Sequence, residues 1–212
     1  MEWRTLPPLS RRLETRPRAF RMNLMVKIYK PTKEEVAAAA GKTVRDVIAK
    51  GLRVLFCGIN PGLYTAAVGR HFARPGNRFW PTLYRAGFTE RLLSPFEERE
   101  LLKGGYGITN MVARATATAA ELSDEEFVRG GRALRSKIRK YRPAFVAFVG
   151  VGAYRTAFGR PKASVGRQEE TLEGAAVWVL PNPSGLNANY QVEDLARLFR
   201  ELREAVEEKD EG

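Results

Sequence analysis

Apolar residues along the chain follow a helical spacing in some segments and form short continuous runs in others. Three helical segments open with a capping box, in which a Ser or Thr precedes a Glu by three positions. These pairs are Thr32 with Glu35, Ser94 with Glu97, and Ser123 with Glu126. We expect helices over residues 32–41, 43–49, 77–86, 123–141, 152–158 and 195–206, and one more that begins at Ser94–Pro95.

Short apolar runs that open into loops predict buried strands. Such runs occupy residues 53–57, 106–109 and 144–149, while Gln168–Leu172 and Ala175–Leu180 predict a hairpin. Strands that alternate with helices form parallel sheets between helical layers. The chain is therefore expected to form a three-layer α/β/α sandwich with a central, mostly parallel sheet of about four or five strands.

The charge of the chain is unevenly distributed. Its 212 residues hold 36 Lys and Arg against 24 Asp and Glu, a formal net charge of +12. Residues 1–22 hold six Arg and two Glu, whereas residues 201–212 hold six acids and two cations, so these segments cancel. Residues 1–22 also contain three Pro and no apolar period, which indicates a flexible basic arm, or a start assigned upstream of Met22 or Met25. We expect residues 23–212 to form a single domain.

Composition narrows the classes of function. The positive charge suits a polyanionic partner, although an Arg-rich chain also arises from a GC-rich genome. One Cys excludes a disulfide framework, an all-Cys zinc site and a four-Cys iron–sulfur cluster, and one His excludes a His-rich metal site. No apolar run approaches the roughly 20 residues that span a bilayer, and no secretory signal is visible. We expect a soluble intracellular protein with no membrane partner.

In open α/β sheets, ligands bind at the loops that follow the carboxyl ends of the strands. Three such loops are candidates, at residues 58–78, 110–122 and 181–190. The first begins with Gly58–Gly62, where glycines permit a close backbone approach and Asn60 is the side chain suited to hold a polar substrate. Neither a dinucleotide-binding nor a Walker fingerprint is present. A tight turn with no ligand is the alternative interpretation.

The loop after the last strand reads Pro181-Asn182-Pro183-Ser184-Gly185-Leu186-Asn187. Two prolines stiffen it, and Leu186 stands at its tip among polar residues. An exposed leucine on a rigid loop is suited to separating stacked bases. The alternative is a leucine that folds back on the core.

Residues 70–80 interleave three Arg and one His with aromatic residues, a pattern that suits phosphate contact and base stacking. We assign Phe79 and Trp80 to the core of the following helix, whereas Phe72 precedes that helix and is free to stack. His71 is the one His of the chain and has no partner for nucleophilic or metal chemistry. We therefore give it no catalytic role.

Three motifs together resemble the mismatch-specific uracil/thymine-DNA glycosylase family, within the uracil-DNA glycosylase superfamily. They are Gly58-Ile59-Asn60-Pro61-Gly62, Pro75-Gly76-Asn77-Arg78-Phe79-Trp80 and Asn182-Pro183-Ser184-Gly185-Leu186. The likeness extends from about Val44 to about Val206. It implies a three-layer α/β/α enzyme that removes a base from DNA without a metal or cofactor. Asn at both Asn60 and Asn182, rather than Asp and His, argues against the highly active uracil glycosylases of the superfamily.

The resemblance also implies a role for each loop. Asn60 and Asn182 would be the catalytic residues: Asn60 would position the attacking water, and Asn182 would face the flipped nucleotide and donate to the leaving base. The residues implied to form the base pocket are Ile59, Pro61, Gly62, Thr65, Phe72 and Asn77. The residues implied to form the DNA wedge and to read the mismatch are Ser184, Gly185, Leu186 and Asn187.

One stretch departs from the family. Met111-Val112-Ala113-Arg114-Ala115-Thr116 stands where the family often has Val-Asp-Arg-Pro-Thr, so Ala113 replaces a common Asp. A carboxylate there would help to activate water or to fix the loop. Its absence bears on the rate and on the substrate range.

The resemblance implies a monofunctional DNA glycosylase, a hydrolase that flips and excises uracil mispaired with guanine and so starts base excision repair. Other damaged pyrimidines are further candidate substrates. The alternative is a catalytically weak or silent protein that binds damaged or mismatched DNA on the same fold. An unrelated α/β nucleotide hydrolase is a third interpretation, against which stands the lack of a phosphate loop or carboxylate cluster. We expect double-stranded DNA with a mispaired or damaged base as partner, no cofactor, a monomeric state, and a place on the nucleoid in a prokaryotic cytoplasm.

Overall fold

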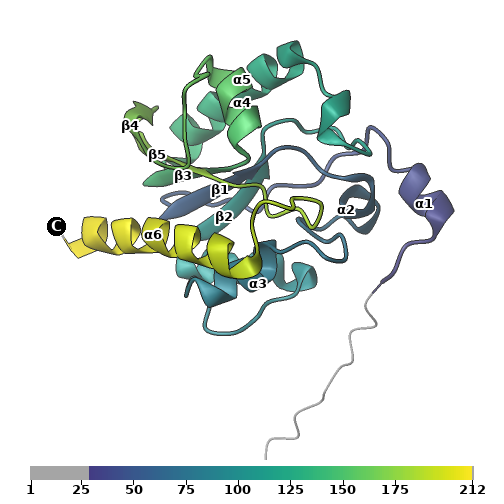
Figure 1. Cartoon of the computed structure of the whole chain (residues 1–212), viewed down its shortest axis with the longest axis horizontal. Helices are drawn as coiled ribbons and strands as arrows, with labels where there is room; N and C mark the ends of the chain where they lie inside the picture. Colours follow the sequence, from purple (N-terminus) through teal and green to yellow (C-terminus); the bar gives the residue numbers. More distant parts are fainter. Residues whose placement is uncertain (1–28, 212) are drawn as a thin grey trace, which may run out of the picture.

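The computed structural model describes residues 29–211, and the basic arm predicted for residues 1–22 lies outside this range. A five-stranded sheet forms its centre, with helices on both faces (Figure 1). The strands are β1 (Val54–Gly58), β2 (Tyr106–Asn110), β3 (Phe145–Val149), β4 (Gly166–Leu172) and β5 (Ala175–Leu180). Their order is β2-β1-β3-β5-β4, and every neighbouring pair is parallel except β4 with β5. The predicted sandwich with a mostly parallel sheet is confirmed.

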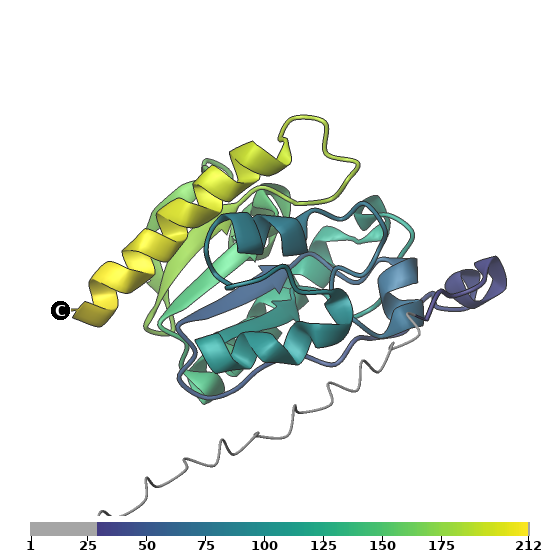
Figure 2. The ribbon, with the colours of Figure 1, turned by 90° about the horizontal axis from the view of Figure 1, so that it is seen from below.

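The inner strands are apolar throughout because both faces of the sheet are buried. Alternate residues of a strand point to opposite faces. Val54 and Phe56 of β1 accordingly lie in one core cluster, and Leu55 and Cys57 lie in the other. Helices cover each face (Figures 1 and 2): α3 (Phe79–Arg85) and α6 (Val192–Glu211) pack in the first cluster, and α4 (Asp124–Tyr141) and α5 (Val151–Phe158) pack in the second.

The capping boxes mark helix starts correctly. The Thr32 hydroxyl accepts a 3.2 Å hydrogen bond from the Glu35 amide at the start of α1 (Lys33–Ala37), and Ser123 caps α4 in the same way. Ser94 also has both bonds of a capping box, but the segment that follows is a 3-10 helix, η1 (Pro95–Gly104). The helix expected from residue 77 begins at Phe79, because the side-chain oxygen of Asn77 accepts from the Phe79 amide at 2.9 Å.

The helix predicted over residues 43–49 is wrong. Val47 is buried there and exchanges two backbone hydrogen bonds, of 2.9 and 2.8 Å, with Ile108 of β2. This antiparallel bridge gives the outer side of β2 a partner, and a helix could not supply it. Conversely, the short elements α2 (Leu63–Val68) and η2 (Ala119–Glu121) lie in segments predicted to be loops. No helix within residues 29–211 is long and apolar enough to cross a membrane.

The parallel strands determine where the loops meet. Because β1, β2, β3 and β5 run in the same direction, their carboxyl ends lie at one edge of the sheet. The register pairs Gly58 with Asn110, and Val149 with Leu180, at the last position of each strand. The loops that leave these positions therefore begin side by side.

Helix α4 packs closely on the loop after β2 at Gly130, where an added Cβ would collide with the carbonyl oxygen of Met111. We expect Gly130→Ala to lower the free energy of unfolding by about 1–3 kcal/mol, because backbone has to move to relieve the collision. The matched control is Gly152→Ala in α5, since no atom lies within 4 Å of its added Cβ. We expect no loss there, and a gain of up to about 1 kcal/mol. Urea unfolding of the three proteins measures both effects, and a Gly130→Ala variant as stable as the wild type would contradict the close packing.

Candidate functional site

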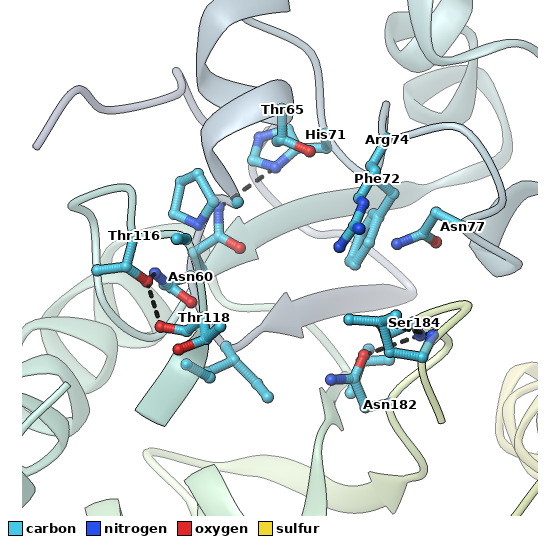
Figure 3. A pocket seen from close by; sticks show the side chains of 18 of the residues that line it. Asn60, Thr65, His71, Phe72, Arg74, Asn77, Thr116, Thr118, Asn182 and Ser184 are labelled. Atoms are coloured by element: carbon cyan, nitrogen blue, oxygen red, sulfur yellow. Dashed lines mark hydrogen bonds between the residues drawn. The ribbon is translucent and has the colours of Figure 1, made fainter. Parts of the chain in front are cut away.

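An open cavity of about 400 Å³ lies at the carboxyl edge of the sheet. Its walls come from the loops after β1, β2 and β5 and from residues 71–77 ahead of α3, and Figure 3 shows their side chains around a common space. Both residues predicted to be catalytic and all six predicted to form the base pocket line this cavity: Asn60, Asn182, Ile59, Pro61, Gly62, Thr65, Phe72 and Asn77.

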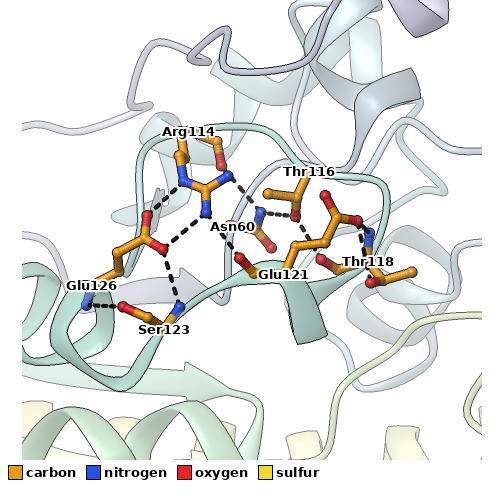
Figure 4. Close-up of polar contacts among 7 residues, drawn as sticks. All are labelled: Asn60, Arg114, Thr116, Thr118, Glu121, Ser123 and Glu126. Carbon is orange, nitrogen blue, oxygen red and sulfur yellow. Dashed lines mark hydrogen bonds and ion pairs between the residues drawn. The ribbon is translucent and has the colours of Figure 1, made fainter.

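The side chain of Asn60 is oriented by the loop after β2. Its Nδ2 donates to the hydroxyl oxygen of Thr116 at 2.7 Å and to the carbonyl of Arg114 at 3.1 Å. The Thr116 hydroxyl itself donates to the carbonyl of Thr118 at 2.7 Å, so toward Asn60 it acts as an acceptor. Both amide hydrogens of Asn60 are thus engaged, whereas Oδ1 has no hydrogen-bond partner among residues 29–211 (Figures 3 and 4). Asn60 therefore presents an acceptor to the cavity.

An ion pair supports this arrangement from outside the cavity. Arg114 binds Glu126 of α4 through two hydrogen bonds, of 2.5 and 2.8 Å, and also donates to the Glu121 carbonyl (Figure 4). The hydrogen bonds from Arg114 lower the pKa of the Glu126 carboxyl to about 2. The pair therefore stays charged at any ordinary pH and fixes the peptide whose carbonyl accepts from Asn60.

Asn182 presents the opposite polarity. Its Oδ1 accepts from the Ser184 amide at 3.0 Å, which turns the side-chain oxygen back into its own loop. Its Nδ2 has no acceptor within the described part of the chain and lies in the wall of the cavity. Asn182 therefore offers a donor where Asn60 offers an acceptor.

Phe72 forms an apolar wall of the cavity. Its backbone has a φ of 53°, a left-handed conformation that non-glycine residues seldom adopt. The ring stacks on Phe79 with centroids 3.9 Å apart, and Phe79 is fully buried as predicted, together with the largely buried Trp80. The rest of the structure thus holds Phe72 in a strained position at the cavity.

The loop between β5 and α6 brings three of the four predicted wedge residues to the cavity. Ser184, Leu186 and Asn187 line it, whereas Gly185 does not. Leu186 is 72% exposed, so it does not fold back on the core. Gly185 packs instead against Gly76, since a Cβ added to it would lie 2.6 Å from the Gly76 carbonyl oxygen.

Ala113 is exposed and is not among the residues that line the cavity. The side chain of this loop that binds the Asn60 amide is that of Thr116, a residue for which no role was predicted. The sequence placed Thr116 in the loop after β2, but nothing in it distinguished Thr116 from the other residues of 110–122.

His71 and Asn110 also line the cavity, although neither was predicted to do so. His71 is almost fully buried, and its Nε2 lies 3.1 Å from the Arg45 carbonyl, so Nε2 carries the proton. Its Nδ1 lies 3.4 Å from Nδ2 of Asn110, which can then donate to it. Burial lowers the pKa of His71 although the nearby Glu98 acts to raise it, so the ring is neutral around pH 7.

The polar groups of the cavity wall are mostly uncharged amides and hydroxyls, and the one cation that residues 29–211 place among them, Arg74, is exposed. No carboxylate of the described residues lines the cavity. Within the same range, no three His, Cys, Asp or Glu side chains gather closely enough to hold a metal ion. The site can hold a water molecule and a flat polar ligand by hydrogen bonds and stacking.

Comparisons with known proteins agree with this fold. The chain is similar to a solution NMR structure of a candidate uracil DNA glycosylase from Methanosarcina acetivorans, with a TM-score of 0.53 and 18% sequence identity over 77% of this chain and 98% of that chain. At this identity the likeness concerns the fold alone. The sequence model of the uracil DNA glycosylase superfamily matches residues 45–207, which include every residue of the cavity wall. The chain therefore belongs to the uracil DNA glycosylase superfamily.

Proposed function

We propose that this protein is a monofunctional DNA glycosylase that hydrolyses the N-glycosidic bond of uracil mispaired with guanine. The observation that carries the proposal is the opposite polarity of two asparagines in one cavity: Oδ1 of Asn60 is free to accept, and Nδ2 of Asn182 is free to donate. Membership of the superfamily supports the reaction class. The three loop motifs support the preference for a mismatch.

The two amides suit the two ends of the reaction. Water adds to C1′ of the deoxyribose as the bond from C1′ to the base breaks, and uracil departs with the bonding electrons as an anion. An amide cannot take up the proton that water loses, so Asn60 contributes by holding the water in line for attack. Asn182 contributes by donating to the anion as its charge develops. The proton from water finally neutralises the uracil, and the products are free base and an abasic site.

The cavity suits a base that has left the helix. Its volume of about 400 Å³ lies in the range of small-ligand sites, and Phe72 offers the base a ring to stack on. Base flipping requires unstacking and unpairing, which cost a few kcal/mol and least at a mismatch. The exposed Leu186 is placed to fill the gap that the base leaves in the helix.

We infer that main-chain groups at the tip of the loop between β5 and α6 recognise the unpaired guanine. The side chain of Asn187 is engaged inside the loop, since its Nδ2 donates to the Asn182 carbonyl at 3.0 Å and its Oδ1 accepts from the Asn189 amide at 3.1 Å. The amide and carbonyl of Gly185 and the carbonyl of Leu186 have no partner within residues 29–211. These groups can meet the Watson–Crick edge of guanine.

The central test is excision of uracil from a duplex with one G·U pair, followed by alkaline cleavage of the abasic site. We expect the wild type to cut at the uracil, and Asn60→Ala to lose roughly a hundred- to a thousand-fold in rate, as for other positioned polar groups. Binding of the same duplex without any cleavage would instead support the silent mismatch-binding protein. A wild type that neither binds nor cuts any mismatched duplex would overturn both interpretations.

Thr116 provides a matched pair of variants for the same assay. Thr116→Val removes the hydroxyl that accepts from Asn60, whereas Thr116→Ser keeps it. If the orientation of the Asn60 amide matters, the valine variant loses most of the rate and the serine variant keeps most of it. Equal rates for the two variants would contradict the role of this hydrogen bond.

Leu186→Ala should distinguish opening of the duplex from chemistry. We expect it to slow excision from duplex DNA by more than it slows excision from single-stranded uracil DNA, because the wedge matters only where a base stack has to be opened. Rates on both substrates under single-turnover conditions measure the difference. Equal losses on the two substrates would rule out the wedge role.

Binding to DNA should weaken steeply with salt, because phosphate contacts release counterions. With Asn60→Ala as the slow background, titration of a G·U duplex between low and moderate salt gives the slope of log K against log salt. Arg74 stands exposed at the cavity, and we expect Arg74→Met to reduce that slope by about one. A response that is flat in salt would show that the Lys and Arg side chains of the protein do not contact the DNA phosphates.

A further inference from the structure

We propose that Arg78 is a positioning residue that holds the loop between β5 and α6 in the shape that presents Leu186 to DNA. The inference rests on the proposed function, because it concerns how the same site opens a duplex. Arg78 belongs to the motif Asn77-Arg78-Phe79-Trp80, in which the base pocket uses the first residue and the core uses the last two. Arg78 itself belongs neither to the base pocket nor to the core.

The guanidinium of Arg78 binds main-chain oxygens along the whole length of this loop. Nη2 donates to the carbonyls of Ser184 and Asn187, the second at 2.7 Å, and Nη1 donates to the carbonyl of Tyr190. The backbone amide of Arg78 also donates to the Pro183 carbonyl at 2.9 Å. One residue at the start of α3 thus contacts four loop carbonyls.

These contacts are the polar attachment of the loop to the body of the protein. Within the described chain, every hydrogen bond from residues 182–190 to residues outside that segment runs to Arg78. The other bonds of the loop are internal turns, such as the Leu186 amide to the Ser184 hydroxyl and the Asn187 amide to the Ser184 carbonyl. Internal turns give the loop a local shape but do not fix its direction. Figure 2 shows how far this loop, between β5 and α6, extends beyond the sheet.

The chemistry of the contact requires an arginine. A planar guanidinium offers donors in several fixed directions, whereas a lysine ammonium offers three from one point on a flexible stem. Arg78 has no carboxylate within ion-pair distance among residues 29–211, and its Nε is buried without a partner. The hydrogen-bond acceptors of this half-buried cation are carbonyl oxygens, and these charge-assisted bonds stabilise it. The same hydrogen bonds therefore stabilise both the half-buried guanidinium and the conformation of the loop.

The consequence concerns paired uracil in particular. Leu186 lies between two of the bound carbonyls, those of Ser184 and Asn187, so its direction depends on both. Without the hydrogen bonds from Arg78, the loop would sample other directions and Leu186 would enter the base stack less often. A base that is already unpaired needs no wedge, and its excision would depend far less on Arg78.

The experiment compares Arg78→Met, Arg78→Lys and the control Arg85→Met. Arg85 stands on the same helix in an exposed ion pair with Glu193, away from the cavity. We expect both Arg78 variants to lower the ratio of excision from G·U duplex to excision from single-stranded uracil DNA by about ten-fold or more, since displacements near 1 Å at a site can cost up to about a hundred-fold in rate. The ratio should not change in Arg85→Met. Arg78→Lys is the decisive variant, because it keeps the positive charge but loses the planar set of donors.

A readout that needs no catalysis accompanies the assay. Cleavage by chymotrypsin after the exposed Leu186 should be faster in both Arg78 variants than in the wild type and in Arg85→Met, at matched thermal stability. A wild-type ratio in Arg78→Lys would mean that only charge matters, and it would overturn the proposal. An unchanged cleavage rate in the Arg78 variants would also overturn it. A wild type that excises uracil from neither substrate would instead refute the proposed function. The chymotrypsin experiment would still test whether Arg78 holds the loop.

Discussion

The parallel pairing of β1 with β2 on one side and β3 on the other is the constraint on which the site depends. Burial of β1 on both faces disfavours a shift of its register, since a shift by one residue would exchange the side chains that pack in the two core clusters. Gly58 is thereby fixed beside Asn110, and the loop that carries Asn60 begins next to the loop that carries Thr116. An added Cβ at Gly58 would lie 2.7 Å from Oδ1 of Asn110, so a larger residue there would have to displace the Asn110 side chain. The Asn60–Thr116 hydrogen bond is a consequence of this register.

Two loops that leave the sheet far apart in the sequence are each anchored by an arginine. Arg114 joins the loop after β2 to α4 through Glu126, and Arg78 joins the loop after β5 to the start of α3. Each arginine fixes the backbone of a loop that also holds or orients an asparagine at the cavity. Neither asparagine could define a direction by itself, because an amide can turn over at little cost unless its two ends have different partners. For Asn60 the loop after β2 supplies that difference, and for Asn182 the Ser184 amide of its own loop does so.

Much of the fold and the position of the site could be predicted from the sequence, because both depend on local patterns. Apolar runs marked the strands, capping boxes marked the starts of α1 and α4, and the loop motifs led to the residues that line the cavity. The remainder depended on distant partners. Val47 lies in a bridge with Ile108, 61 residues away, and not in the predicted helix. Thr116, 56 residues from Asn60, binds its Nδ2 and so turns Oδ1 toward the cavity. The choice between a buried and an exposed Leu186 likewise depended on where the whole loop is attached.

Several of the 36 Lys and Arg side chains are held by contacts within the structure and are therefore less free to meet a polyanion. Arg114, Arg135 and Arg139 bind carboxylates, and Arg78 binds carbonyls. The groups that line the cavity are by contrast mostly neutral. Burial keeps His71 uncharged, and Glu126 is ionised down to a pH of about 2, so neither changes its charge near pH 7. A site built from amides has no pKa to adjust, and its performance depends on the direction of a few hydrogen bonds. The arginines that fix those directions, Arg78 and Arg114, therefore matter to the proposed chemistry although they do not line the cavity.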